Sequence, residues 1–295
     1  MDEKRLDIRH VSDVPLSEIS GLGQRRRPGS DGLELLAVGD EEFTVVASTV
    51  GDDAVVGDFE SFRLQDLIDD ADPNRGSQWE AADGDSTGRL YILQEDPPRV
   101  FVINPGLDEL LVDIELRFES DEGVAFDGDP APNSQGEGLV LLKSGHLLIA
   151  KEKDPPVLME FGPLAADPEG ASPGLLFSVD DEFPLPEERR TRFILLKVWR
   201  LDEEAESIIS DISDVAVGPD NRLYILSDES RCIARLEPSL DPEDTRLTIE
   251  TLWRLPEELE QPEGLVLTDD LSPIVAIDRK DRDANLFSLS SLRAR

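Results

Sequence analysis

One pattern recurs five times along this chain, and it constrains the fold more than any other feature. Each copy reads as a short apolar strand, a turn with Gly, Asp or Pro, a second apolar strand, and then a cluster of carboxylates. The copies start at Ile19, Trp79, Gly136, Ile212 and Pro262. A period of roughly 50 to 60 residues with several strands in each repeat is typical of a β-propeller, which gathers equivalent positions of its repeats around a central channel.

Apolar runs between turn signals predict four strands in each of the first four repeats, the fourth strand of the first repeat falling at residues 61–67 (SFRLQDL). The fifth repeat supplies only three strands. Residues 5–11 (RLDIRHV) alternate apolar and polar side chains, so we expect them to dock as the missing outer strand and close the ring; a disordered arm is the alternative. The prediction is one all-β domain over residues 1–295, a β-propeller of five four-stranded blades, with six blades as the alternative.

Two long segments fall outside the repeats. Residues 119–135 form a connection, and residues 162–191 form an insertion between the third and fourth strands of one blade. Both are rich in Pro, Gly and acidic residues, which predicts surface loops. Loops of this length can cover a binding site, so both are candidates for a lid; a surface excursion without a role is the alternative.

The chain carries a large excess of negative charge. It has 66 Asp and Glu residues against 29 Lys and Arg, for a formal net charge of −37. Such a field repels nucleic acids and anionic membranes, so neither is an expected partner. An acidic surface with few lysines fits a salt-rich cytoplasm, where ions screen the repulsion; an ordinary acidic soluble protein is the alternative.

The sequence shows no mark of export. The first ten residues, MDEKRLDIRH, lack the apolar core of a signal peptide. No apolar run approaches the ~18 residues that a membrane span requires. Cys232 is the only cysteine, so no internal disulfide can form. We therefore expect a cytoplasmic monomer whose partner is a small ligand or a protein, while a leader already removed stays open.

The first candidate site lies at the start of each repeat. The lead positions are Ser20, Glu80, Glu137, Ser213 and Glu263. Because the first strand of each repeat lines the channel, the three glutamates would point into one small space. Like charges so close cannot all stay ionised unless their pKa values rise, basic partners approach, or a hard cation such as Ca²⁺ binds their oxygens. The candidate metal ligands, with Ca²⁺ as the cofactor, are Glu80, Glu137, Asp214 and Glu263.

The second candidate site follows the second strand of each repeat, at one mouth of the expected channel. It comprises Asp40, Glu41, Glu95, Asp96, Lys151, Glu152, Lys153, Asp154, Asp228, Glu229, Arg231, Asp278, Arg279 and Lys280. The basic side chains could pair with the channel glutamates or bind an anionic ligand; solvated turn residues are the alternative. The candidate ligand-binding residues are Lys151, Glu152, Lys153, Asp228, Glu229 and Arg231.

Other chemistry has little support. His10 lies in the closing arm, and His146 precedes an apolar run where a surface position is expected. Two histidines disfavour a zinc site built on imidazoles and a Ser-His-acid triad. No Gly-rich phosphate-binding loop occurs.

Three segments carry a family resemblance. They are GEGLVLLKSGHLLIAKEKDPP at 136–156, ISDVAVGPDNRLYILSDESRCIARLE at 212–237, and QPEGLVLTDD at 261–270. With these segments the chain resembles the SdiA-regulated family of bacterial β-propellers over residues 15–290. The positions that match the family pattern are Glu137, Lys151, Glu152, Lys153, Asp228, Glu229, Ser230 and Glu263. The resemblance implies a propeller fold but brings no biochemical function, and related propellers of the lactonase and phytase types hold calcium in the channel.

These observations favour a binding protein with a carboxylate-rich channel that holds a divalent cation or a small ligand. A metal-dependent hydrolase of a lactone or phosphoester is one alternative, with Glu137 or Glu263 as the general base. A protein-interaction scaffold is the other. The sequence leaves open whether the chain is an enzyme.

Overall fold

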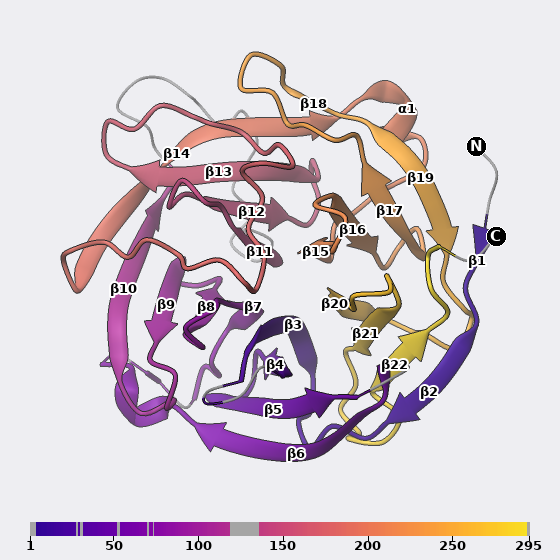
Figure 1. Ribbon diagram of the computed structural model, residues 1–295, viewed down its shortest axis with the longest axis horizontal. Helices are drawn as coiled ribbons and strands as arrows, with labels where there is room; N and C mark the ends of the chain where they lie inside the picture. Colours follow the sequence, from indigo (N-terminus) through magenta and orange to yellow (C-terminus); the bar gives the residue numbers. More distant parts are fainter. Residues whose placement is uncertain are drawn as a thin grey trace.

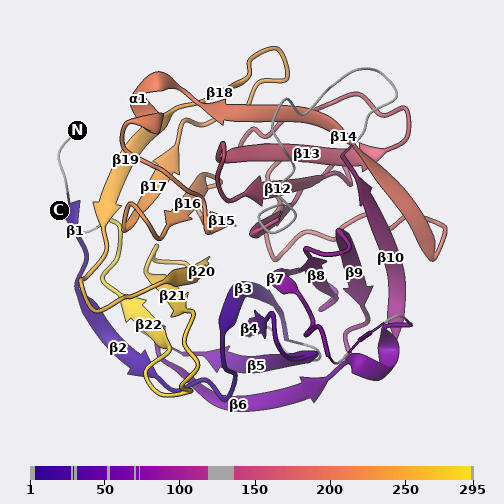
Figure 2. The same cartoon turned by 180° about the vertical axis from the view of Figure 1, so that it is seen from behind.

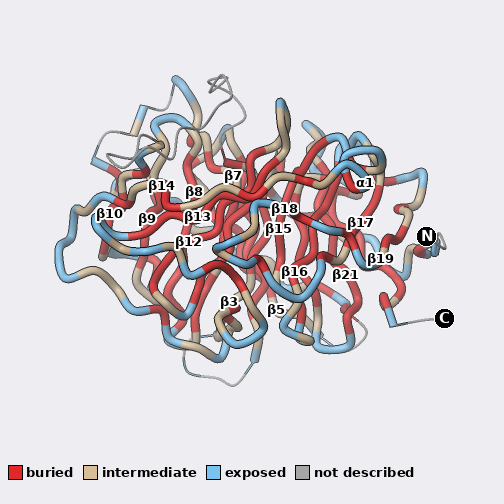
Figure 3. The backbone as a smooth tube through the Cα atoms, turned by 90° about the horizontal axis from the view of Figure 1, so that it is seen from above, coloured by how far each residue is buried: buried red, intermediate tan, exposed pale blue. Residues whose placement is uncertain are grey.

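The chain folds into a ring of antiparallel β-sheets around a central axis (Figure 1). The computed structural model describes residues 4–293 except residues 28, 30, 31, 52, 53, 70, 73 and 119–135. In each repeat the first strand stands beside the axis and the last strand lies at the rim, and the view from behind shows the same order (Figure 2). From the edge, buried strands run through the middle and exposed turns follow both faces (Figure 3). This architecture is that of a β-propeller.

Each repeat contributes strands in sequence order. The first forms β3 (Ile19–Arg26), β4 (Leu33–Gly39), β5 (Thr44–Val50) and β6 (Val56–Arg63). The second forms β7 (Trp79–Gly84), β8 (Leu90–Gln94), β9 (Arg99–Ile103) and β10 (Leu110–Arg117). The third forms β11 (Gly138–Leu141), β12 (Leu147–Lys151), β13 (Val157–Pro163) and β14 (Arg190–Leu201). The fourth forms β15 (Asp214–Val217), β16 (Leu223–Ser227), β17 (Cys232–Leu236) and β19 (Ile249–Arg254), and the fifth forms β20 (Pro262–Leu267), β21 (Pro273–Ile277) and β22 (Leu286–Leu289).

Hydrogen bonds group the described strands into four sheets. The first, fourth and fifth repeats each form a separate sheet. The second and third repeats are joined, because their rim strands β10 and β14 pair in parallel with Ile114 opposite Thr191. The short β18 (Arg246–Leu247) extends this joint sheet by pairing with β14.

The N-terminal segment belongs to two repeats. β2 (Ile8–Ser12) pairs antiparallel with β22 as the fourth strand of the last sheet, with Val11 opposite Phe287. β1 (Lys4–Arg5) pairs in parallel with β19 of the preceding repeat. Leu6, between them, is buried in the core that the fourth and fifth repeats share. The segment expected as one strand over residues 5–11 is therefore two short strands.

The rim strand of the first repeat differs from the prediction. β6 begins at Val56, five residues before the expected start at residue 61, and ends at Arg63. Leu64, which the pattern assigned to this strand, instead precedes a 3₁₀ turn, η2 (Gln65–Leu67). A rim strand exposes much of its surface to solvent, so its first half carries too few apolar side chains to stand out in the sequence.

Small residues after the lead positions let the inner strands pack closely. A Cβ added to Gly21 would lie 2.4 Å from the carbonyl oxygen of Glu80, and one added to Gly138 would lie 2.6 Å from the backbone nitrogen of Val215. Both distances are too short for real atoms, so β3 can approach β7, and β11 can approach β15, only because these positions lack a side chain. The recurrent Gly after the lead residue is thus a packing requirement of the ring.

The insertion expected over residues 162–191 lies between β13 and β14 and packs back onto the ring. Leu176 forms a β-bridge with Leu142, and Ala171 forms one with Leu240 of the fourth repeat. Phe177 and Phe183 are buried in the core of the second and third repeats. The insertion is thus a packed part of the domain. The connection expected at residues 119–135 lies outside the described residues.

The expected surface position of His146 is wrong. Its side chain is 5% exposed, and Nδ1 lies 2.6 Å from Oε1 of the fully buried Glu160. Glu160 also accepts bonds of 2.9 Å from the backbone N–H groups of Glu169 and Gly170. The pair therefore ties the insertion to β13. The apolar pattern did not indicate this, because Glu160 stands alone inside the apolar run VLMEF.

Helix contributes little to the described chain. Its one α-helix, α1 (Glu203–Glu206), is a single turn with Asp202 as N-cap. None of the helices within the described residues has the length and apolar character needed to span a membrane.

Candidate functional site

The lead residues of three repeats sit in the same irregularity of the inner strand. The pairing register between the first and second strands shifts around Ser20, around Glu80 and around Glu263. Such a β-bulge leaves one residue outside the ladder and re-aims its side chain, and bulges are frequent beside binding sites. Glu137 is not part of such a bulge. It stands immediately before β11, at the start of the inner strand of its repeat.

The residue two positions before each bulge is held in an unfavourable backbone conformation. Glu18, Gln78 and Gln261 have φ angles of 49°, 54° and 51°, in the left-handed region that costs a non-Gly residue roughly 1–2 kcal/mol. Hydrogen bonds hold this conformation in place. For Gln78, the backbone N–H donates to the carbonyl of Asp40 at 2.8 Å, and its carbonyl accepts from Glu95 at 2.9 Å. Strain that recurs at equivalent positions points to a role for the residues it aims.

Glu80, Glu137 and Glu263 come within electrostatic reach of one another. Burial, followed by the charges of Glu95 and Asp40, raises the pKa of Glu80 to about 8. Burial also raises the pKa of Glu137 well above its usual value, and the charges of Glu80 and Glu263 add to this effect. Burial is also the largest cause of the raised pKa of Glu263, and the charge of Glu80 is among those that raise this pKa. Each keeps a partly exposed side chain.

The second candidate site lies at the same mouth of the channel. Antiparallel pairing brings the end of each second strand beside the start of the first, as where Trp79 of β7 lies opposite Gln94 of β8. Burial, followed by the charges of Glu18 and Glu41, raises the pKa of Asp40 to about 6. We name this end of the channel the acidic mouth; it comprises Asp40, Glu80, Glu95, Glu137, Glu152, Asp228, Glu263 and Asp278.

Of the basic residues predicted at this mouth, Lys151 and Lys153 contact their own turn, while Arg231 contacts the segment that follows β19. Lys151 is 1% exposed, and its Nζ donates to the carbonyl of Lys153. Burial lowers the pKa of Lys151, and nearby carboxylates including Glu137 act in the opposite direction. Lys153 Nζ lies 2.7 Å from Glu152, and Arg231 donates to the carbonyl of Pro256 at 2.9 Å. Carboxylates therefore outnumber the basic groups at the acidic mouth.

Asp214 has different neighbours from the three glutamates. It occupies the position where other repeats have Gly or Ala, and it is buried. Its carboxylate accepts a bond of 2.7 Å from Val215 N–H and one of 2.6 Å from Leu265 N–H, so it links β15 to β20. Burial raises its pKa, and the neighbouring charge is Asp83.

The acidic mouth is not a ready-made cation cage. Within the described part of the chain, no three or more His, Cys, Asp or Glu side chains are arranged so as to hold a metal ion. The three glutamates influence one another through their charges. A divalent cation would need their side chains to move together.

One protein-family model matches the chain. The model of the SdiA-regulated family matches residues 115–274, more than half of the chain. The chain belongs to the SdiA-regulated family. The matched region contains Glu137, Glu263 and the strands from β11 to β20 that position them. A comparison with curated protein sequences found no match.

Solved structures resemble this SdiA-regulated protein only distantly. The PQQ-bound form of an aldose sugar dehydrogenase from Streptomyces coelicolor has a TM-score of 0.49 and 11% identity, with 97% of each chain covered. A streptogramin B lyase has a TM-score of 0.46 and 11% identity, also with 97% of each chain covered. A putative gluconolactonase has a TM-score of 0.43 and 13% identity, with 97% of this chain and 82% of the other covered. Similarity at this level carries no information about what this chain binds.

Asp211 holds the turn at residues 227–230 (SDES), which is part of the 212–237 segment that resembles the SdiA-regulated family. Its buried carboxylate accepts from the hydroxyl of Ser227, from the backbone N–H of Asp228 at 2.9 Å, and from that of Glu229 at 3.3 Å. The Ser213 hydroxyl donates to it at 3.2 Å. Asp211 thus fixes the turn that carries Asp228 to the acidic mouth. Sequence reasoning missed it, although the equivalent position holds Glu18 in the first repeat and glutamine in the other three. That recurrence of polar side chains is the signal that could have found it.

Proposed function

We propose that this protein is a five-bladed propeller that binds a cation, in the first place Ca²⁺, at the acidic mouth. The observation that carries the proposal is the convergence of Glu80, Glu137 and Glu263 from three inner strands, with each pKa raised by burial and by neighbouring acids. Calcium takes six to eight oxygen ligands in flexible geometry, so it suits carboxylates supplied by several repeats. The four strands of each repeat, with β2 completing the fifth, support the blade number.

Binding would require the glutamates to draw together and lose their protons. Because no described cluster is already arranged for a metal ion, the cation must offset both the repulsion between the carboxylates and the burial that favours their neutral form. Metal binding to protonated ligands releases protons, so affinity rises with pH. With a pKa of about 8 for Glu80, this release should extend through neutral pH.

Calorimetric titration with CaCl₂ tests the proposal. We expect saturable binding to the wild type that strengthens between pH 6 and pH 8 and releases protons to the buffer. Glu137→Gln and Glu263→Gln should each weaken binding at least tenfold, because each removes a charged ligand. Glu258→Gln, at an exposed position outside the channel, is the matched control and should bind as the wild type does.

The absence of a heat of binding at millimolar Ca²⁺ would falsify the calcium proposal. The acidic mouth would then be a network stabilised by protons and by Lys151, and Lys151→Met would destabilise the fold by leaving carboxylates without that charge. The hydrolase alternative uses the same residues, so hydrolysis of a lactone or phosphoester that depends on Ca²⁺ and on Glu137 would distinguish it from simple binding.

A further inference from the structure

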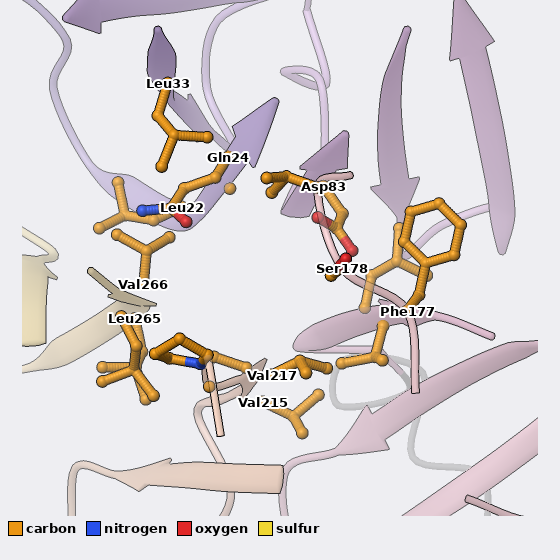
Figure 4. Close-up of a pocket in the computed structure, with 18 of the residues that line it drawn as sticks. Leu22, Gln24, Leu33, Asp83, Phe177, Ser178, Val215, Val217, Leu265 and Val266 are labelled. Atoms are coloured by element: carbon orange, nitrogen blue, oxygen red, sulfur yellow. The ribbon is translucent and has the colours of Figure 1, made fainter. Parts of the chain in front are cut away.

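A hollow lies at the end of the channel opposite the acidic mouth. Its volume is about 350 Å³, and its walls come from the ends of β3, β7, β11, β15 and β20 together with residues 177–180 of the insertion. Figure 4 shows Leu22, Leu265 and Val266 on one side, and Asp83, Ser178 and Phe177 on the other. Sites for small molecules span roughly 300 to 1,000 Å³. This hollow has a volume within that range, and its lining mixes aliphatic side chains with a slightly larger share of polar surface.

The insertion is anchored over this end of the channel from three repeats. Arg26 of the first repeat donates to Asp180 at 2.7 Å through Nε. Arg89 of the second repeat lies 2.7 Å from Glu182, and Lys143 of the third lies 3.2 Å from Asp181. The Phe183 ring packs edge-on against Tyr91, at 5.3 Å between centroids. These contacts hold Phe177 and Ser178 in the wall of the hollow.

Asp83 offers acceptor capacity to the hollow. It lies on an inner strand deep in the molecule yet is not fully buried, and it lines the hollow, so its exposed surface faces this space. One carboxylate oxygen accepts from Gly84 N–H at 2.8 Å, and the backbone N–H of Leu141 also bonds to the group. A carboxylate has about four acceptor sites, which leaves room for a ligand hydroxyl or N–H.

Gln24 supplies a donor in the same wall. Its Nε2 is shielded from solvent and has no hydrogen-bond partner among the described residues. A buried donor without a partner is destabilising, and a rotation of the Gln24 side chain that brings Nε2 to an acceptor on a ligand in the hollow removes that penalty. Asp83 and Gln24 therefore call for a molecule that both donates and accepts hydrogen bonds.

The charges around the hollow select against anions. Asp83, Asp180 and Asp269 line it, while Arg26, the one basic residue in its described lining, already pairs with Asp180. A net negative wall repels an anionic ligand. The aliphatic side chains of Leu22, Leu265 and Val266 on one wall favour a ligand with an apolar body.

We propose that this hollow is a binding site for a compact uncharged molecule with an apolar body and a hydroxyl or amide group. The insertion forms its outer wall, and Asp83 and Gln24 orient the polar group. This site is independent of cation binding at the acidic mouth, because it uses other residues at the other end of the channel.

Fluorescence titration with 2-naphthalenemethanol tests the site, with 2-naphthoate as the anionic counterpart. We expect saturable binding of the alcohol at millimolar concentrations or below, and binding of the anion at least tenfold weaker. Gln24→Leu keeps the side-chain bulk but removes the donor, and should weaken binding about five- to tenfold. Gln65→Leu, outside the channel, is the matched control and should change nothing.

Val217→Trp fills the hollow and should abolish binding while the melting temperature shows that the variant folds. If that variant does not fold, Leu33→Trp fills the space from another wall. Absence of saturable binding to the wild type, equal binding to a folded filling variant, or equal affinity for the alcohol and the anion would each overturn the proposal. Because Ca²⁺ plays no part in this titration, its outcome is separate from that of the cation proposal.

Discussion

Glu80 and Glu263 occupy β-bulges that follow a residue with a left-handed backbone conformation. The packing of the inner strands does not require glutamate at these positions. In two other repeats the same lead position is occupied by serine, Ser20 and Ser213, and the inner strands pack in the same way. The Ser20 hydroxyl donates to the carbonyl of Trp79, so a small side chain serves the structure well. A buried, mutually repelling glutamate at the equivalent position lowers stability. Its presence in three repeats therefore supports a role in binding.

The raised pKa values predict an unusual dependence of stability on pH. Glu80 has an ordinary pKa of 4.5 and a folded pKa of about 8, so between these values the folded state binds more protons than the unfolded state. The free energy of unfolding must then fall as pH rises from 5 to 8. One pKa unit corresponds to about 1.4 kcal/mol. The titration of Glu80 alone therefore lowers the free energy of unfolding by up to a few kcal/mol between pH 5 and pH 8.

The measurement is the melting temperature at pH 5 and pH 8 without divalent cations. Glu80→Gln should reduce the difference between the two values, because Gln does not titrate. Glu258→Gln changes the overall charge by the same amount at an exposed site and should leave the difference as it is. Equal pH responses of the two variants would contradict the assigned pKa of Glu80.

The lead glutamates were predictable from the sequence, and the carboxylates that organise single loops were not. The electrostatic proximity of Glu80, Glu137 and Glu263 was expected from their equivalent positions. Asp211 and Glu160 are buried carboxylates that each organise a single loop. Asp211 shares its repeat position with Glu18, whereas Glu160 stands alone in an apolar run. Their role depends on which backbone N–H groups the tertiary fold brings to them. A sequence pattern contains no information of that kind.

Strands near the axis were easier to predict than strands at the rim. Inner strands such as β8 and β16 are buried along their whole length, so they read as continuous apolar runs. Rim strands such as β6 and β2 leave nearly all of their residues exposed or half-buried, so their ends could not be read from hydropathy. The parallel pairing of β10 with β14 has no local signal, because it depends on the distance between two repeats.

The N-terminal strands offer a matched pair of substitutions. Leu6, between β1 and β2, is 5% exposed in the core of the fourth and fifth repeats, whereas Val11 in β2 is 48% exposed. Leu6→Ala should destabilise by about 2–5 kcal/mol, as truncation of a buried leucine generally does. Val11→Ala should cost less than about 0.5 kcal/mol, as exposed substitutions do.

Urea unfolding of both variants measures the difference. Removal of residues 1–12 should lower the stability further and expose β22 as a free edge, which promotes self-association. If Leu6→Ala unfolds at the same urea concentration as Val11→Ala, the N-terminal segment does not close the ring in solution.

The whole molecule has two different channel ends. One end gathers carboxylates whose pKa values are raised by burial and by mutual repulsion, and the other is walled by an insertion fixed to three repeats. The inner strands separate them with close contacts such as Gly21 against Glu80. The two proposed sites therefore use different residues, and their ligands would not come into contact.

The net charge of −37 predicts that salt stabilises the whole molecule. Carboxylates repel one another more strongly in the compact fold than in the expanded unfolded chain, and the Debye length falls from about 10 Å at 0.1 M to about 3 Å at 1 M salt. The melting temperature should therefore rise by several degrees between dilute buffer and molar KCl at pH 7.5. The rise should be smaller at pH 4.5, where protonation already removes part of the charge.

Choosing KCl avoids the strong exclusion effects of sulfate, which would stabilise most proteins regardless of charge. A melting temperature that stays constant across this range at pH 7.5 would show that the acidic surface is not adapted to salt, and that local pairs such as Arg25 with Glu34, 2.6 Å apart, already offset the repulsion.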